Sequence, residues 1–152
     1  MKKVLTLTLV HNHPQILLGM KKRGFGAGKW NGFGGKVEPG ESIEDAALRE
    51  MREEAGIELA SVEKFGVLDF SWKDNPEILE VHIFRGKEFL GKPKESDEMK
   101  PQWFHVNEIP FHAMWSDDKH WMPLFLANKK FNGNFVFDKD NNVLEHNLTV
   151  FS

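Results

Sequence analysis

Seven glycines lie within residues 24–40, immediately before a segment that has the pattern of a helix. A stretch this rich in glycine cannot form one regular element, because glycine weakens helices and strands and permits irregular backbone. The helix is predicted over residues 42–55, with Ser42 as its N-cap and Gly56 as its stop. The chain is therefore predicted to contain an irregular loop whose backbone leads directly into a capped helix.

Three glutamates give this helix an unusual charge distribution. The apolar arc of the helix is formed by Ile43, Ala46, Ala47, Leu48, Met51 and Ala55. At about 100° per residue from Ile43, Glu50, Glu53 and Glu54 fall at about 340°, 280° and 20°, on or beside this arc. Carboxylates directed at a packed face need compensation, because burial of an unpaired charge is costly. A divalent metal would supply it, and donors made only of oxygen favour magnesium or manganese. The alternative is that these are ordinary helix glutamates paired with Arg49 and Arg52.

The remaining hydrophobic patterns predict a sheet and a second helix. Alternating apolar and polar residues within 1–10 predict a strand with two distinct faces. Further strands are predicted over 16–20, 62–72, 78–85 and 102–106, a helix over 118–130, and a closing hairpin over 135–137 and 143–150. A length of 152 residues is typical of one domain, so we expect a single α/β (α+β) domain over residues 1–152.

Composition excludes several classes of function. The chain has no cysteine, which excludes a disulfide scaffold, a thiolate zinc site and a cysteine nucleophile. The net charge of −3 disfavours a general grip on nucleic-acid phosphates, so no nucleic-acid polymer is expected as a partner. No segment approaches the roughly 20 apolar residues of a membrane span. We expect a cytoplasmic monomer with no membrane contact.

The loop and the acidic helix together match a known motif. Gly35 begins the run GKVEPGE that ends at Glu41, seven residues follow, and residues 49–57 read REMREEAGI. This pattern resembles the Nudix box, G-x5-E-x7-R-E-U-x-E-E-x-G-U, in which U is a bulky aliphatic residue, and every defined position matches. The resemblance implies an α/β/α sandwich with a mixed sheet, a loop–helix–loop metal site, and hydrolysis of a nucleoside diphosphate linked to another moiety.

The resemblance to Nudix hydrolases also implies roles for the charged residues. It implies Mg²⁺, or Mn²⁺, held by one carbonyl and four carboxylates: those of Gly34, Glu50, Glu53, Glu54 and Glu98. Such a metal neutralises phosphate oxygens and lowers the pKa of an attacking water. Arg49 is interpreted as an orienting ion pair, and Glu41 as a brace for the loop. The proton acceptor for the water stays open among Glu53, Glu54 and Glu98.

Segments outside the motif resemble one subgroup of the family. Residues 20–36, 95–99 and 114–118 are similar to the eukaryotic-type MutT homologues, which are oxidised purine nucleoside triphosphatases. Two departures are Ser116, where the subgroup commonly has proline, and Leu79, where it has methionine in the pocket wall. The similarity implies hydrolysis of substrates such as 8-oxo-dGTP and 2-hydroxy-dATP to a monophosphate and pyrophosphate, with a small nucleotide as the only partner.

The same similarity suggests where the substrate binds. The base is expected among four aromatic rings, those of Phe25, Phe33, Phe70 and Trp115. Polar groups are expected to read its edge or line its pocket, namely Asn31, Asp117, Asp118 and Thr6. Lys21 is expected to contact the triphosphate, and Gly34, Gly35 and Lys36 are also expected to bind the substrate. Alternatively, Asp117 and Asp118 merely cap the helix that begins near Lys119.

Other interpretations stay open at this point. A Nudix hydrolase of this kind could act instead on dinucleoside polyphosphates, nucleotide sugars or capped RNA, or the fold could be a catalytically silent nucleotide- or RNA-binding module. His11 and His13 flank Asn12 and are interpreted as a solvated loop, because no further ligand pattern accompanies them. Residues 21–23 form a basic triplet that could attract phosphates or lie on a solvated face.

Overall fold

A mixed eight-stranded sheet organises the protein, and the computed structural model describes residues 2–151. The strands are β1 (Lys2–Asn12), β2 (Gln15–Lys21), β3 (Trp30–Asn31), β4 (Glu58–Leu59), β5 (Glu63–Trp72), β6 (Ile78–Gly86), β7 (Phe89–Leu90), β8 (Met99–His105), β9 (Lys130–Phe137) and β10 (Val143–Phe151). The α-helices are α1 (Ile43–Ala55) and α2 (Asp118–Leu126), and two 3₁₀ turns are η1 (Val106–Glu108) and η2 (Phe111–Ala113). The predicted α/β class is confirmed.

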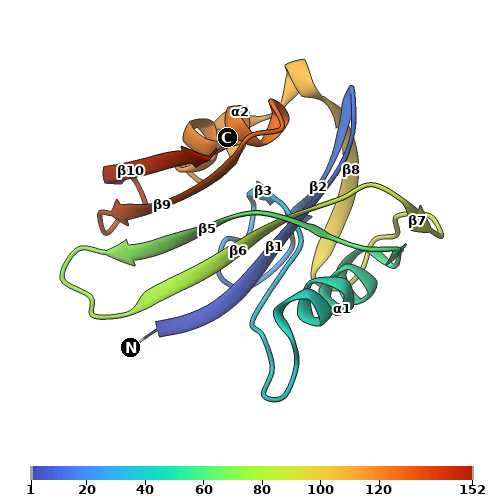
Figure 1. Ribbon diagram of the computed structural model, residues 1–152, viewed down its shortest axis with the longest axis horizontal. Coiled ribbons are helices and arrows are strands. Elements are labelled where there is room, and N and C mark those ends of the chain that lie inside the picture. The colour runs from blue at the N-terminus through green and yellow to red at the C-terminus, as the bar shows by residue number, and fades with distance from the viewer. Residues whose placement is uncertain (1, 152) are drawn as a thin grey trace.

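The order of strands in the large sheet is β10-β9-β5-β6-β1-β2-β3, with β8 paired to β2, and β4 pairs separately with β7. Two pairs are parallel, β1 with β6 and β5 with β9, and the others are antiparallel. The parallel pairs bring together segments about 60 to 80 residues apart, because a parallel connection needs a crossover. Strand β1 thus lies between β2, which follows it directly, and β6, from the middle of the chain (Figure 1).

The two faces of the sheet bury separate apolar clusters, each under one helix (Figure 1). Met51 and Ala55 of α1 pack with Val10 and Leu17 on one side. Trp121 and other apolar residues of α2 pack on the opposite side with Leu9, Ile16, Val81 and Phe135. Neighbouring residues of β1 enter opposite clusters because strand side chains alternate between faces. The result is the sandwich of a sheet between helices that the sequence predicts.

Two predicted boundaries near the C-terminus are wrong. The helix expected over 118–130 ends at Leu126. Two residues later Asn128 takes a positive φ of 63°, and the N–H of Lys129 bonds back to the Leu124 carbonyl. Strand β9 then begins at Lys130 rather than at residue 135. Apart from Phe131, its first half is polar or glycine and has little strand character of its own. It is held by parallel pairing to β5 from Gly66↔Phe131 onwards and by antiparallel pairing to β10.

Candidate active site

The helix behind the glycine-rich loop has both predicted caps. Ser42 Oγ accepts a hydrogen bond from the Asp45 N–H at 3.1 Å. Gly56 has a φ of 70°, a left-handed conformation that suits glycine, and its N–H bonds to the Arg52 carbonyl. These local contacts set the position of the helix relative to the loop and confirm the predicted loop–helix unit.

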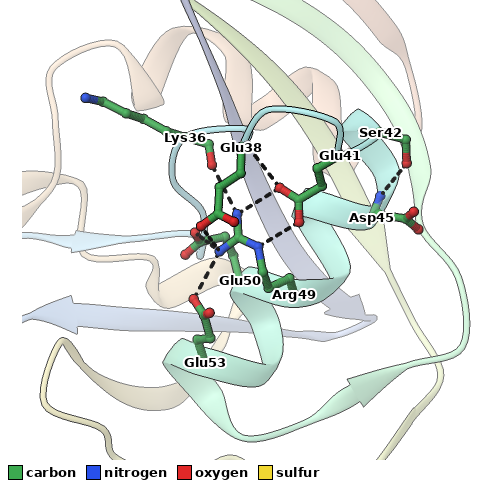
Figure 2. Close-up of polar contacts among 8 residues, drawn as sticks. All are labelled: Lys36, Glu38, Glu41, Ser42, Asp45, Arg49, Glu50 and Glu53. Carbon is green, nitrogen blue, oxygen red and sulfur yellow. Dashed lines mark hydrogen bonds and ion pairs between the residues drawn. The ribbon is translucent and has the colours of Figure 1, made fainter.

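Arg49 is the centre of an ion-pair network that ties the helix to the loop (Figure 2). Its Nε and one terminal nitrogen donate to both Glu41 oxygens, at 2.7 and 3.0 Å. The terminal nitrogen that binds Glu41 also donates to the Lys36 carbonyl at 3.1 Å. The other terminal nitrogen donates to Glu50 at 2.8 Å and to Glu53 at 3.1 Å. These contacts raise the pKa of Arg49 and lower that of Glu41. Arg49 therefore orients two carboxylates of the motif, and Glu41 braces the loop.

Glu54 is the most buried carboxylate of the helix, with only 6% of the residue exposed. It accepts a hydrogen bond from the Gly34 N–H at 2.9 Å. Burial and, secondarily, the negative charge of Glu50 raise its pKa to about 8. Burial also raises the pKa of Glu50. A side chain at Gly35 would place its Cβ 2.8 Å from Glu50 Oε1, so glycine is what lets the loop backbone lie against this carboxylate pair.

Glu53 and Glu98 lie in more open surroundings. The side chain of Glu53 is 58% exposed, so the expectation of a packed orientation is wrong for it, because its angular position lies at the edge of the arc beside Arg49. Glu98 pairs with Arg23 at 2.9 Å and with Lys21 at 3.5 Å. Within residues 2–151 no three ligating side chains are already gathered as a metal cluster. The donors nevertheless fit magnesium, because they are all oxygen and two of them are buried with their charge only partly compensated.

A cavity of about 290 Å³ opens beside this acidic site, and Glu54 lines it. Six of the predicted binding residues line its wall: Thr6, Lys21, Phe25, Asn31, Gly34 and Gly35. Four more of the predicted binding residues also line it: Phe70, Trp115, Asp117 and Asp118. Leu79 is in the wall too. The structure therefore brings the predicted base-reading residues and the acidic helix to one cavity.

Phe33 and Lys36 do not line the cavity. Phe33 is fully buried in the cluster beneath α1, because its backbone exchanges hydrogen bonds with Thr8 and so directs the ring to the other side of the sheet. The expectation that it contacts the base is therefore corrected. Lys36 contributes its carbonyl to Arg49, and its side chain extends away from the network (Figure 2).

The sequence reasoning missed part of the aromatic wall. Trp72 and Phe137 line the cavity, as does Met99. Trp72 could have been found, since it follows Phe70 by two residues on a predicted strand and therefore shares its face. Phe25 is 67% exposed, and its ring centroid lies 5.0 Å from that of Trp115 and 6.1 Å from that of Trp72. These rings form an aromatic mouth to the cavity.

Asp117 and Asp118 line the cavity and are almost completely buried. Asp117 occupies the N-cap position of α2 but makes no capping hydrogen bond with its side chain; its Oδ2 accepts from Trp121 Nε1 at 2.8 Å. Burial raises the pKa of Asp117 to about 6. Burial and then the charge of Asp117 raise the pKa of Asp118 well above its usual range. A proton held by Asp118 lets it donate to Asp117, whereas two carboxylates have no hydrogen to share.

The surroundings of the basic triplet and of His11 differ from those expected, whereas those of His13 do not. Lys22 pairs with Glu95 at 2.6 Å and Arg23 with Glu98, so the triplet is tied to the loop before β8 rather than simply solvated. His11 is only 5% exposed because it lies within β1 and packs against Phe125, so the predicted solvated loop is wrong for it. His13, in the following turn, is exposed.

The family model for the NUDIX domain matches residues 2–125, which include the glycine-rich loop and all of α1. The chain belongs to the Nudix family. Nudix hydrolases generally use divalent metals such as Mg²⁺, which agrees with the oxygen donors that the loop and α1 provide. Neither α1 nor α2 has the length and apolar character to span a membrane, and no other α-helix occurs in residues 2–151.

Several relatives match this Nudix chain over nearly its full length. It is 53% identical to the oxidized purine nucleoside triphosphate hydrolase of Danio rerio and 49% identical to that of Mus musculus, in each case over 96% of this chain and 94% of the relative. Among solved structures, the mutator MutT protein of Bacillus halodurans superposes with a TM-score of 0.83 at 28% identity, covering 96% of this chain and 97% of that one. The fold and the whole site thus lie within the matched region.

Proposed function

We propose that this Nudix protein is a pyrophosphohydrolase that converts oxidised purine nucleoside triphosphates, such as 8-oxo-dGTP and 2-hydroxy-dATP, to the monophosphate and pyrophosphate, and so sanitises the nucleotide pool. The observation that supports this most is the buried pair Asp117 and Asp118 in an aromatic cavity that continues to Glu54. The relatives named above, at 53% and 49% identity, support the same substrate class. The protein acts as a cytoplasmic monomer.

The aspartate pair supplies the choice of base. Aromatic rings such as Phe25 and Trp115 stack on any base and therefore give affinity without selectivity. A protonated Asp118 beside Asp117 offers one donor and one acceptor, and moving the proton between them exchanges the two roles. The pair can thus match the edge of either an oxidised guanine or an oxidised adenine. Asn31 and Thr6, which line the same cavity, supply further polar contacts.

The acidic helix and the loop supply the hydrolytic machinery. Magnesium would be held by the Gly34 carbonyl and by the carboxylates of Glu50, Glu53, Glu54 and Glu98, and when bound it neutralises phosphate charge and acidifies the attacking water. Arg49 holds Glu50 and Glu53 in place for that task. Lys21 lies between the cavity and Glu98, where it can release the carboxylate and bind a phosphate.

A substrate screen tests the proposal. The purified protein with Mg²⁺ is given 8-oxo-dGTP, 2-hydroxy-dATP, dGTP, dATP, a dinucleoside polyphosphate and a nucleotide sugar, and the products are separated by anion-exchange chromatography. The expected result is a preference for the oxidised purines, with monophosphate and pyrophosphate as first products. Release of inorganic phosphate first, preference for a dinucleoside substrate, or binding without turnover would each overturn it.

A further inference from the structure

The segment between β7 and β8, residues 91–98, binds the end of α1. The last carbonyls of a helix have no partner within the helix and need donors from elsewhere. The Lys94 N–H donates to the Ala55 carbonyl at 2.8 Å, and the Ser96 hydroxyl donates to the Glu54 carbonyl at 2.9 Å. The segment is therefore joined to α1 at Glu54, whose carboxylate is the most buried of the helix.

Ser96 also holds the backbone that carries Glu98. Its Oγ accepts hydrogen bonds from the Met99 N–H at 3.1 Å and from the Glu98 N–H at 3.3 Å. A serine hydroxyl has one hydrogen to donate and two lone pairs that accept, so these bonds and the donation to Glu54 use its full capacity. The Met99 carbonyl, at 3.5 Å, is a more distant acceptor for the same hydrogen. Ser96 thus connects the backbone of Glu54 to that of Glu98.

Two cations at and just beyond the end of β2 orient the Glu98 carboxylate. Nε and one terminal nitrogen of Arg23 lie 3.0 and 2.9 Å from Oε1, and the Lys21 ammonium lies 3.5 Å from Oε2. Lys21 also lines the cavity, together with Glu54. Burial and the charge of Glu50 raise the pKa of Glu54 most, and the charge of Glu98 raises it further. Glu98 is thus held within electrostatic reach of Glu54, with its backbone fixed by the serine and its carboxylate by the two cations.

We propose that Ser96 is a positioning residue that sets the place of Glu98 relative to Glu54, so that carboxylates from α1 and from the loop before β8 serve one divalent cation. This inference rests on the metal site of the proposed function. Glu50, Glu53 and Glu54 share one helix, which fixes their spacing, whereas Glu98 belongs to a loop and needs a tertiary contact to fix it. A ligand that is ordered beforehand avoids the entropic cost of ordering it on binding. Ser96 is not itself a ligand, because its oxygen is already fully bonded.

Binding of Mn²⁺ in the absence of nucleotide tests this role, because electron paramagnetic resonance measures the free ion directly. Ser96→Ala removes the hydroxyl without changing any charge and should weaken Mn²⁺ affinity about tenfold, as is typical when a group that supports a metal ligand is lost. Ser116→Ala is the matched control, since the Ser116 hydroxyl also donates to a distant backbone carbonyl, that of Asn141 at 2.8 Å. This control should bind Mn²⁺ as the wild type does. Equal affinities in Ser96→Ala and the wild type would overturn the proposal.

A double-mutant cycle shows whether Ser96 acts through Glu98. In that case Ser96→Ala should change the Mn²⁺ affinity of the Glu98→Gln protein by less than about twofold, because the ligand that the serine positions is already lost. The same loss in both backgrounds would reject the proposal, since the serine would then act on α1 or on the whole fold. Urea unfolding with EDTA present gives the folded fraction of each variant, so that affinities are compared per folded molecule.

The same measurements separate a failure of this inference from a failure of the proposed metal site. The expected pattern is weaker Mn²⁺ binding by Glu53→Gln, Glu98→Gln and Ser96→Ala. Weaker binding by the two glutamine variants alone would keep the metal site and reject the role of Ser96. Wild-type affinity in both glutamine variants would reject the metal site itself, and the role of Ser96 with it.

Discussion

Asp118→Asn should flatten the dependence of stability on pH. The native pKa of Asp118 is raised above its unfolded value by burial and by the charge of Asp117. Above the unfolded pKa the native state therefore keeps a proton that the unfolded state has lost, and stability falls as pH rises towards the native pKa. Asparagine carries no such proton, and its amide can still donate to Asp117.

The size of the change in stability follows from the linkage between proton binding and folding. Each pH unit between the unfolded and native pKa values of one carboxyl changes the free energy of unfolding by about 1.4 kcal/mol. Between about pH 5.5 and pH 7.5 the wild type should therefore lose at most roughly 3 kcal/mol through Asp118 alone. For a protein of this size that corresponds to a Tm change of at most roughly 6 to 12 °C. Glu54, whose pKa is also raised, contributes equally to both proteins and cancels in their difference.

Urea unfolding followed by tryptophan fluorescence, with EDTA present, measures this difference at the two pH values. Asp140→Asn is the matched control, because Asp140 is exposed in the turn before β10. The control should follow the wild type, while Asp118→Asn should lose less stability on going to the higher pH. If all three proteins have the same pH slope, Asp118 is ionised in the native state, and the donor–acceptor account of base reading is refuted.

Four further substitutions separate the roles of the site residues. Glu53→Gln should fold normally, since its side chain is 58% exposed, but lose roughly a hundredfold or more of the Mg²⁺-dependent pyrophosphate release; full activity would exclude it as a ligand. Arg49→Lys should raise the Mg²⁺ concentration needed for half-maximal activity, because one ammonium cannot bridge several carboxylates; an unchanged requirement would contradict this. Gly34→Ala should cost about 3 kcal/mol or more in urea unfolding, as its Cβ would lie 1.8 Å from the Thr6 carbonyl oxygen, and a stable variant would disprove the close approach. Trp121→Phe removes the donor to Asp117 and should change the ratio of 8-oxo-dGTP to 2-hydroxy-dATP turnover; a constant ratio would mean that this hydrogen bond does not set base choice.

The loop and helix of the acidic site could be predicted because their contacts are local. Ser42 caps a residue three positions away, Gly56 bonds to the carbonyl four positions before it, and Arg49 reaches Glu53 one helical turn later. Such contacts need only helical geometry, so the sequence pattern is sufficient. The same pattern led to the expected pairing of Arg49 with acidic neighbours, although only the structure revealed that Glu41 takes the largest share.

The directions of several side chains could not be predicted from the sequence, because they depend on partners that are distant in sequence. Glu53 and Glu54 are adjacent in sequence, yet Glu54 is buried against the loop through Gly34, and Glu53 remains mostly exposed. Phe33 is directed to the α1 side by its backbone bonds to Thr8. A helical wheel or a list of aromatic residues cannot distinguish these cases, because the partner strand determines which face each side chain occupies.

The sequence by itself determined the fold class, the capped helix, the acidic motif and most of the residues of the base pocket. Only the tertiary structure decided that residues from Thr6 to Phe137 surround one cavity, and that Ser96 links the backbones of Glu54 and Glu98. The pairing of β1 with β6 sets Leu5 beside Val81, and the pairing of β5 with β9 sets Trp72 beside Phe137. All four residues line the cavity. Those parallel pairings join segments far apart in sequence, and their register follows from the packing of the whole sheet rather than from any local pattern.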